Sequence, residues 1–98
     1  MIKSDKISII VPVYNQAKYI ARCLRSIFNQ SFSSDLFDVF IINDGSKDNL
    51  FQEIESFLKK QIKITYLINK TNKGLPFSLN RGILESDSEF IIRIDGDD

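Results

Sequence analysis

Short apolar segments alternate with longer amphipathic ones along this chain. Four apolar runs, each rich in β-branched or aromatic residues, span residues 6–15, 37–44, 63–69 and 89–94. Runs of this length and composition are typical of buried β-strands. The pattern therefore predicts four strands, and polar residues follow the apolar run at the carboxyl end of each.

Three helices are predicted between the strands, because apolar residues there recur every three or four positions. In residues 16–30 the apolar positions are Ala17, Ile20, Leu24, Ile27 and Phe28. The second helix is expected to begin at Ser46 as its N-cap, with Asp48 in its first turn. The third is expected to begin near Pro76, because proline suits the first turn of a helix.

This alternation of strands and helices predicts an α/β fold in three layers, α/β/α, with a mostly parallel sheet covered on both faces. Connections between parallel strands are expected to be right-handed. The first strand is apolar enough for the centre of the sheet, and we predict the strand order 3-2-1-4. The 98 residues suffice for a single domain with one core.

The composition excludes several classes of function. The 13 basic and 13 acidic residues balance, so no overall field favours nucleic acid as a partner. The absence of histidine excludes histidine-based triads and histidine-rich zinc sites within this chain. The single cysteine, Cys23, is expected to pack in the core, and a chain without a disulfide framework suits a reducing compartment. No apolar run approaches the length of a membrane span.

Two aspartates follow the fourth predicted strand, at the edge of the sheet where open parallel sheets bind their ligands. Asp95 and Asp97 flank Gly96, which permits a bend that turns both carboxylates towards one point. Oxygen ligands of this kind suit Mg²⁺ or Mn²⁺. The alternative is a solvated acidic loop, and the position after an apolar strand favours the metal.

Other strand ends offer groups that suit a nucleotide. Asp44 ends the second predicted strand, where a carboxylate is well placed to accept hydrogen bonds from a nucleoside, although it also suits a turn residue that caps the next helix. Tyr14 offers an aromatic face to a base, or else packs against its own loop. Arg81, on the third helix, faces either a diphosphate or solvent. The chain has neither a glycine-rich dinucleotide motif nor a P-loop motif.

Four segments together resemble family 2 glycosyltransferases of the GT-A fold, and they cover essentially the whole chain. They read IIVPVYNQAKYIARCLRSIFNQSF, DVFIINDGSKDNL, NKGLPFSLNRGI and EFIIRIDGDD. The resemblance implies transfer of a sugar from a nucleoside-diphosphate donor to an acceptor hydroxyl, usually with inversion. It also implies a divalent metal, Mn²⁺ or Mg²⁺, which stabilises the charge on the departing diphosphate.

The resemblance also implies roles for individual residues. Contacts with the nucleotide sugar are implied for Pro12, Tyr14, Asn15, Asp44, Gly74, Arg81 and Asp95. Metal contacts are implied for Asp95 and Asp97, with Asp97 as the direct ligand and Asp95 facing the ribose or a metal-bound water. Asp98 fits a third acidic position that is common in the family.

The general base of this family lies well beyond the paired aspartates, in the part of the domain that binds the acceptor. We therefore expect residues 1–98 to be the nucleotide-sugar-binding half of a larger domain, truncated after that motif and inactive alone. The expected acceptor is a sugar or a lipid-linked group in polysaccharide biosynthesis. The expected location is the cytoplasm, at the inner face of the membrane for the full-length protein.

Two other functions remain open. The chain could be a non-catalytic module that binds a nucleotide or a metal, complete as it stands. A phosphoryl-transfer domain is a weaker alternative, because its paired aspartates would follow the first strand and not the fourth.

The fourth strand is also expected to be an unpaired edge of the sheet, with Phe90, Ile91, Ile92 and Ile94 exposed. Unpaired edges favour pairing with another chain, so self-association is predicted.

Overall fold

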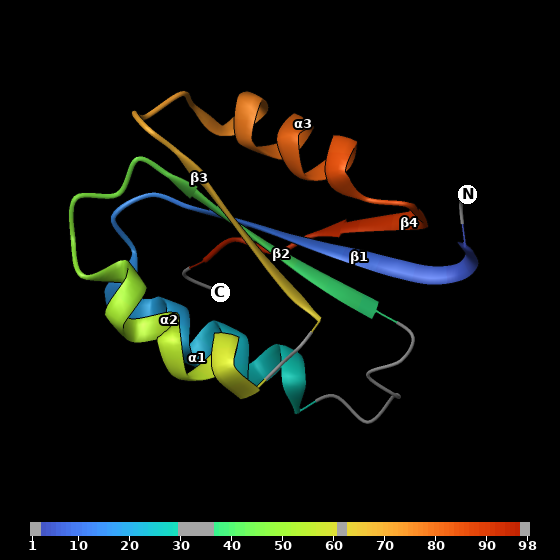
Figure 1. Ribbon diagram of the computed structural model, residues 1–98, viewed down its shortest axis with the longest axis horizontal. Coiled ribbons are helices and arrows are strands. Elements are labelled where there is room, and N and C mark those ends of the chain that lie inside the picture. The colour runs from blue at the N-terminus through green and yellow to red at the C-terminus, as the bar shows by residue number, and fades with distance from the viewer. Residues whose placement is uncertain (1–2, 30–36, 61–62, 97–98) are drawn as a thin grey trace.

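The computed structural model describes residues 3–29, 37–60 and 63–96, with the side chains of residues 3–5 left out of the description (Figure 1). Strands and helices alternate along the chain as predicted. They are β1 (Lys3–Val13), α1 (Ala17–Phe28), β2 (Phe37–Asp44), α2 (Leu50–Lys60), β3 (Ile64–Asn69), α3 (Leu75–Glu85) and β4 (Ser88–Arg93). None of the helices described here is long and apolar enough to cross a membrane.

The four strands form one parallel sheet in the order β3-β2-β1-β4. In β1, Ile9 lies opposite Val39 of β2 on one side and Ile92 of β4 on the other. Helices α1 and α2 lie on one face of the sheet and α3 lies on the other (Figure 1). The predicted three-layer fold and strand order are therefore confirmed.

The two faces of the sheet bury different amounts of apolar surface. Alternate residues of β1 point to opposite faces, so that Ile9 and Val11 meet α1 and α2 whereas Ile10 meets α3. The larger core, on the α1 and α2 face, includes Cys23, which is 1% exposed. The prediction that Cys23 packs in the core is confirmed.

The predicted start of the second helix is wrong, because α2 begins at Leu50 and not after Ser46. The Ser46 hydroxyl accepts a hydrogen bond from the backbone N–H of Asn15 at 3.0 Å. Asp48 lies outside the first turn of α2, and its Oδ2 accepts a hydrogen bond from the backbone N–H of Ala17, the first residue of α1, at 3.0 Å. Both side chains thus satisfy donors of the preceding β1–α1 connection, which lies beside them because β1 and β2 are parallel neighbours.

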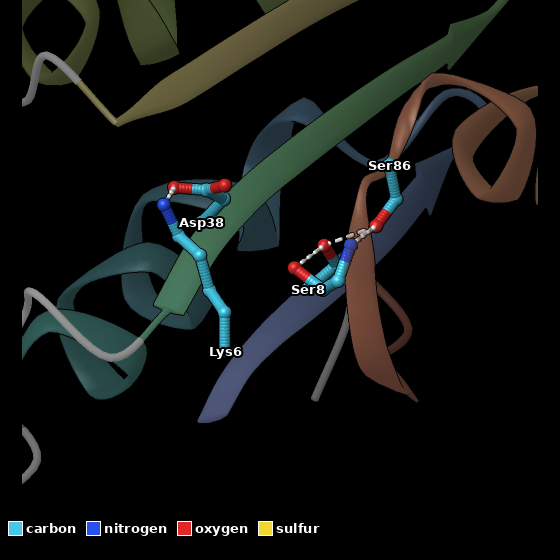
Figure 2. A network of polar contacts seen from close by, with 5 residues as sticks. Lys6, Ser8, Asp38 and Ser86 are labelled. Atoms are coloured by element: carbon cyan, nitrogen blue, oxygen red, sulfur yellow. Dashed lines mark hydrogen bonds and ion pairs between the residues drawn. The ribbon is translucent and has the colours of Figure 1, made fainter. Parts of the chain in front are cut away.

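A cluster of three serine hydroxyls lies at the opposite, amino-terminal end of the sheet (Figure 2). The Ser8 hydroxyl on β1 donates to Ser88 Oγ at 2.8 Å and lies 2.5 Å from Ser86 Oγ. The backbone N–H of Ser88 also donates to Ser86 Oγ, at 3.1 Å. Ser8 is 0% exposed, so these hydrogen bonds satisfy polar groups that are removed from water. They also join the turn before β4 to β1. Beside them, Lys6 and Asp38 form an ion pair at 3.1 Å that joins β1 to β2 (Figure 2).

Strand β4 lies at the edge of the sheet and, among the strands described, pairs with β1 alone. Phe90, Ile91 and Ile92 are 56%, 40% and 46% exposed, as expected for an edge strand. Ile94 differs from the expectation, because it is half-buried and packs against the larger core. Self-association through this edge stays a prediction.

The serine cluster generates a stability prediction. Ser8→Ala should lower the free energy of unfolding by about 1–3 kcal/mol, because it removes a hydrogen-bond partner from two hydroxyls in a buried or half-buried place. The measurement is urea unfolding followed by circular dichroism.

The exposed helical Ser56 is the matched control, and Ser56→Ala should change the free energy of unfolding by no more than about 0.5 kcal/mol. The double variant Ser8→Ala/Ser88→Ala should cost less than the sum of its two single variants, because the hydrogen bond that the two hydroxyls share is lost in each single variant but only once in the double variant. Additive costs would show that the two hydroxyls do not stabilise each other.

Candidate functional site

A pocket of about 260 Å³ lies beyond the carboxyl ends of β1, β2 and β4, next to the start of α3. We call it the strand-end pocket. It is lined by Pro12, Val13, Tyr14, Gln16, Asp44, Leu75, Ser78, Arg93 and Asp95. The pocket therefore lies where a parallel α/β sheet is expected to bind its ligand.

The fold brings four of the predicted site residues together in this pocket: Pro12, Tyr14, Asp44 and Asp95. Three others, Asn15, Gly74 and Arg81, lie outside its lining. Asp97, the predicted metal ligand, lies outside the described residues, as does Asp98.

Asp44 is 5% exposed, and its carboxylate accepts four hydrogen bonds from its own chain. Its Oδ1 accepts from Asn69 Nδ2 at 2.9 Å and from the backbone N–H of Lys73 at 2.7 Å. Its Oδ2 accepts from Asn72 Nδ2 at 3.1 Å and from the backbone N–H of Gly74 at 3.0 Å. Asp44 thus holds the loop that leads into α3, and it does not cap α2 as one reading of the sequence suggested.

Asn69, at the end of β3, extends this hydrogen-bond network to two residues of α3. Its Nδ2 also donates to Ser78 Oγ at 3.0 Å, and its Oδ1 accepts from Arg81 Nη1 at 2.8 Å. Arg81 donates in addition to the carbonyl of Ile68 at 2.6 Å. The guanidinium of Arg81 therefore fastens α3 to β3, on the far side of the network from the strand-end pocket.

Asn15 and Gly45 join neighbouring loops at the same edge of the sheet. Asn15 has a φ of 53°, a conformation that asparagine tolerates, and its Oδ1 accepts from the backbone N–H of Lys47 at 2.8 Å. Gly45 has a φ of 74°, and a Cβ there would lie 2.5 Å from the backbone nitrogen of Asn72. This turn requires glycine, because both its conformation and its close approach to the next loop exclude a side chain.

The sequence interpretation missed three polar residues of the pocket, Gln16, Ser78 and Arg93. Ser78 had a readable signal, because it and Gly82 are small residues four positions apart on the inner face of α3. A Cβ at Gly82 would lie 2.8 Å from Ile10 Cγ2, so the helix packs closely onto β1 there.

Arg93 also had a signal in the sequence, because it interrupts an otherwise apolar strand. Its Nε donates to Asp95 Oδ1 at 2.8 Å.

The described residues supply one part of the predicted metal site. Asp95 presents carboxylate oxygens at the pocket, and oxygen donors suit Mg²⁺ or Mn²⁺. Residues 3–29, 37–60 and 63–96 contain no group of three or more acidic, histidine or cysteine side chains that could hold a metal. The donor chemistry of Asp95 fits a hard cation, and a cation bound there would need further oxygen donors from outside the described residues or from a bound substrate.

An open parallel α/β sheet with a polar pocket at its carboxyl edge is an architecture that binds its ligands at that edge. The family model described as "Glycosyl transferase family 2" matches residues 8–98, and the chain belongs to that family.

Curated relatives agree with this assignment. The chain is 35% identical over 98 residues to an uncharacterized glycosyltransferase of Rickettsia bellii, covering 100% of this chain and 14% of that protein. It is 36% identical over 95 residues to the poly(ribitol-phosphate) β-N-acetylglucosaminyltransferase TarS of Staphylococcus aureus, covering 95% of this chain and 16% of TarS. The chain thus spans about a seventh of the length of the first of these relatives and about a sixth of the length of the second.

Solved structures share the fold. The crystal structure of S. aureus TarS 1–349 in complex with UDP-GlcNAc has a TM-score of 0.86 and 33% identity, over 94% of this chain and 26% of that one. The mannosyltransferase PcManGT of Pyrobaculum calidifontis, in complex with GDP-Man and Mn²⁺, has a TM-score of 0.88 over 97% of this chain and 28% of that one. At 22% identity, the second likeness shows the fold alone.

The Asp44 network generates a second stability prediction. Asp44→Asn replaces one acceptor oxygen by an NH₂ group, which faces two donors and leaves both unpaired. We expect the free energy of unfolding to fall by about 1–3 kcal/mol, and amide exchange to accelerate at Lys73 or Gly74, whichever N–H faces the new NH₂ group.

The control is Asp87→Asn at an exposed position before β4, which should be nearly neutral. Unchanged protection of the Lys73 and Gly74 amides in Asp44→Asn would contradict the role of Asp44 in holding this loop.

Proposed function

We propose that this chain binds a nucleoside-diphosphate sugar in the strand-end pocket, and that the protein containing it transfers the sugar to an acceptor hydroxyl with inversion. The observation that carries the proposal is the convergence of Tyr14, Asp44 and Asp95 at one pocket in a family 2 chain. The UDP-GlcNAc complex of TarS supports a nucleotide sugar as the class of donor.

Tyr14 is the residue we assign to the base. Tyr14 is 44% exposed beyond the end of β1, which leaves its ring accessible for stacking, and Pro12 adds apolar lining to the same pocket. Asp44 is assigned a second role at the base or ribose. It holds the loop 72–74, and a nucleoside donor group would have to join or displace one of its four hydrogen bonds.

Asp95, together with Asp97, is assigned to a divalent cation and the diphosphate. When bound, Mn²⁺ or Mg²⁺ would neutralise the charge that develops on the leaving diphosphate. Asp95 would hold its carboxylate at the mouth of the pocket through the hydrogen bond from Arg93 Nε.

The described pocket offers no carboxylate that is free to act as the general base. Asp44 is occupied by four hydrogen bonds, and Asp95 is paired with Arg93. We therefore propose that the base and the acceptor site belong to a part of the protein outside residues 1–98.

The nucleotide proposal is tested by isothermal titration of the 98-residue chain with UDP and GDP in excess Mn²⁺. Tyr14→Ala should weaken binding of the preferred nucleotide by about 5- to 150-fold, because base–aromatic stacking contributes ~1–3 kcal/mol.

Tyr19 is a matched control, because it is a tyrosine of similar exposure, 40%, on α1 and outside the pocket lining. Tyr19→Ala should leave the affinity unchanged. Equal losses in the two variants, or no binding of either nucleotide by the wild type, would contradict the proposed site.

The catalytic proposal predicts that the 98-residue chain alone transfers no sugar from UDP-GlcNAc or GDP-mannose in the presence of Mn²⁺. A radiolabelled-donor assay with sugar and lipid-linked acceptors is the measurement. Turnover by this chain would show that a general base lies within it.

A further inference from the structure

Among the described residues that line the strand-end pocket, Arg93 is the only one with a positively charged side chain. The same lining includes two carboxylates, Asp44 and Asp95. Without Arg93, those residues would present only negative charge to a ligand that carries negative phosphates. The position of Arg93 therefore bears directly on whether a diphosphate can enter.

The guanidinium of Arg93 is held at one of its three nitrogens. Its Nε donates to Asp95 Oδ1 at 2.8 Å, two residues along the chain. Within the described part of the chain, Nη1 and Nη2 make no hydrogen bond or ion pair, although each carries two N–H donors. The side chain is 45% exposed and is part of the lining of the strand-end pocket.

Arg81 makes a useful contrast. Its Nη1 is engaged by two acceptors, the Ile68 carbonyl and Asn69 Oδ1, and it lies outside the strand-end pocket lining. Arg81, which has a structural role, therefore has acceptors at one of its Nη groups. Arg93 has no acceptor at either Nη group among the described residues.

We propose that Arg93 binds the phosphates of the donor, with Nη1 and Nη2 as the binding pair and Asp95 as the group that orients them. The proposal rests on the proposed nucleotide-sugar function and adds a residue to it. A guanidinium fixed through Nε presents its two remaining nitrogens side by side, which matches the spacing of two phosphate oxygens. Arg93 then supplies affinity for the diphosphate, whereas Tyr14 supplies affinity for the base.

This division of roles gives a test that distinguishes binding of the diphosphate from binding of the base. The 98-residue chain and its Arg93→Gln variant are titrated with a nucleoside diphosphate and with the corresponding nucleoside, using uridine or guanosine according to which diphosphate binds the wild type more tightly. Each titration is made in excess Mn²⁺ and again in EDTA, where any preference for the diphosphate must come from protein groups alone. Arg25→Gln on the exposed face of α1 is the control for loss of one positive charge.

We expect Arg93→Gln to reduce the preference for the diphosphate over the nucleoside roughly ten-fold or more in EDTA, because hydrogen bonds to charged groups are of that strength. Affinity for the nucleoside should stay within about two-fold, and Arg25→Gln should match the wild type in both. Arg93→Lys should recover part of the preference, because it restores the charge without the paired donors.

An unchanged preference in a folded Arg93→Gln variant would overturn the assignment of Arg93 and leave the nucleotide site standing. A loss of affinity for nucleoside and diphosphate alike would also overturn it, because that result indicates damage to the pocket as a whole. A wild-type chain that binds no nucleoside or nucleotide would remove the proposed function and this inference together. Thermal unfolding of each variant by circular dichroism establishes that the comparison is made between folded proteins.

Discussion

One buried carboxylate determines the shape of the functional edge of this domain. Asp44 leaves the end of β2 and accepts hydrogen bonds from Asn69, Asn72 and the backbone before α3. A buried charge is tolerated only when such donors surround it, so the loop must follow the path that delivers them. The start of α3, and with it one wall of the strand-end pocket, is placed by this requirement.

The elements of the fold were predictable because their signals are local. The apolar run of β2 was bounded correctly at residues 37–44, and the alternation of strands and helices implied the parallel sheet. The pocket was predictable in part for the same reason, because residues at the ends of parallel strands share one edge. The sequence therefore places Pro12, Tyr14, Asp44 and Asp95 at one edge, and in the structure they line one pocket.

The failures concern side chains whose partners are distant in sequence. Ser46 and Asp48 have the residue types of a helix N-terminus, but they satisfy donors about 31 positions earlier, at Asn15 and Ala17. Arg81 was expected to face either a diphosphate or solvent, whereas in the structure it donates to Asn69 and to the Ile68 carbonyl, and its contact with the nucleotide stays a prediction. Residue type shows that a side chain can donate or accept, whereas only the packing of loops decides which partner lies within reach.

The burial of Cys23 has a consequence for experiments on this chain. Its sulfur lies beneath the end of β4, within 3.7 Å of the backbone oxygen of Asp95, and it is the only thiol in the sequence. Cys23 is 1% exposed, so a reagent such as a disulfide or maleimide reaches this sulfur when the packing around it opens, and buried thiols react through such openings. The rate of labelling at Cys23 would thus report, without any engineered probe, how often this edge of the domain opens and how far a ligand slows it.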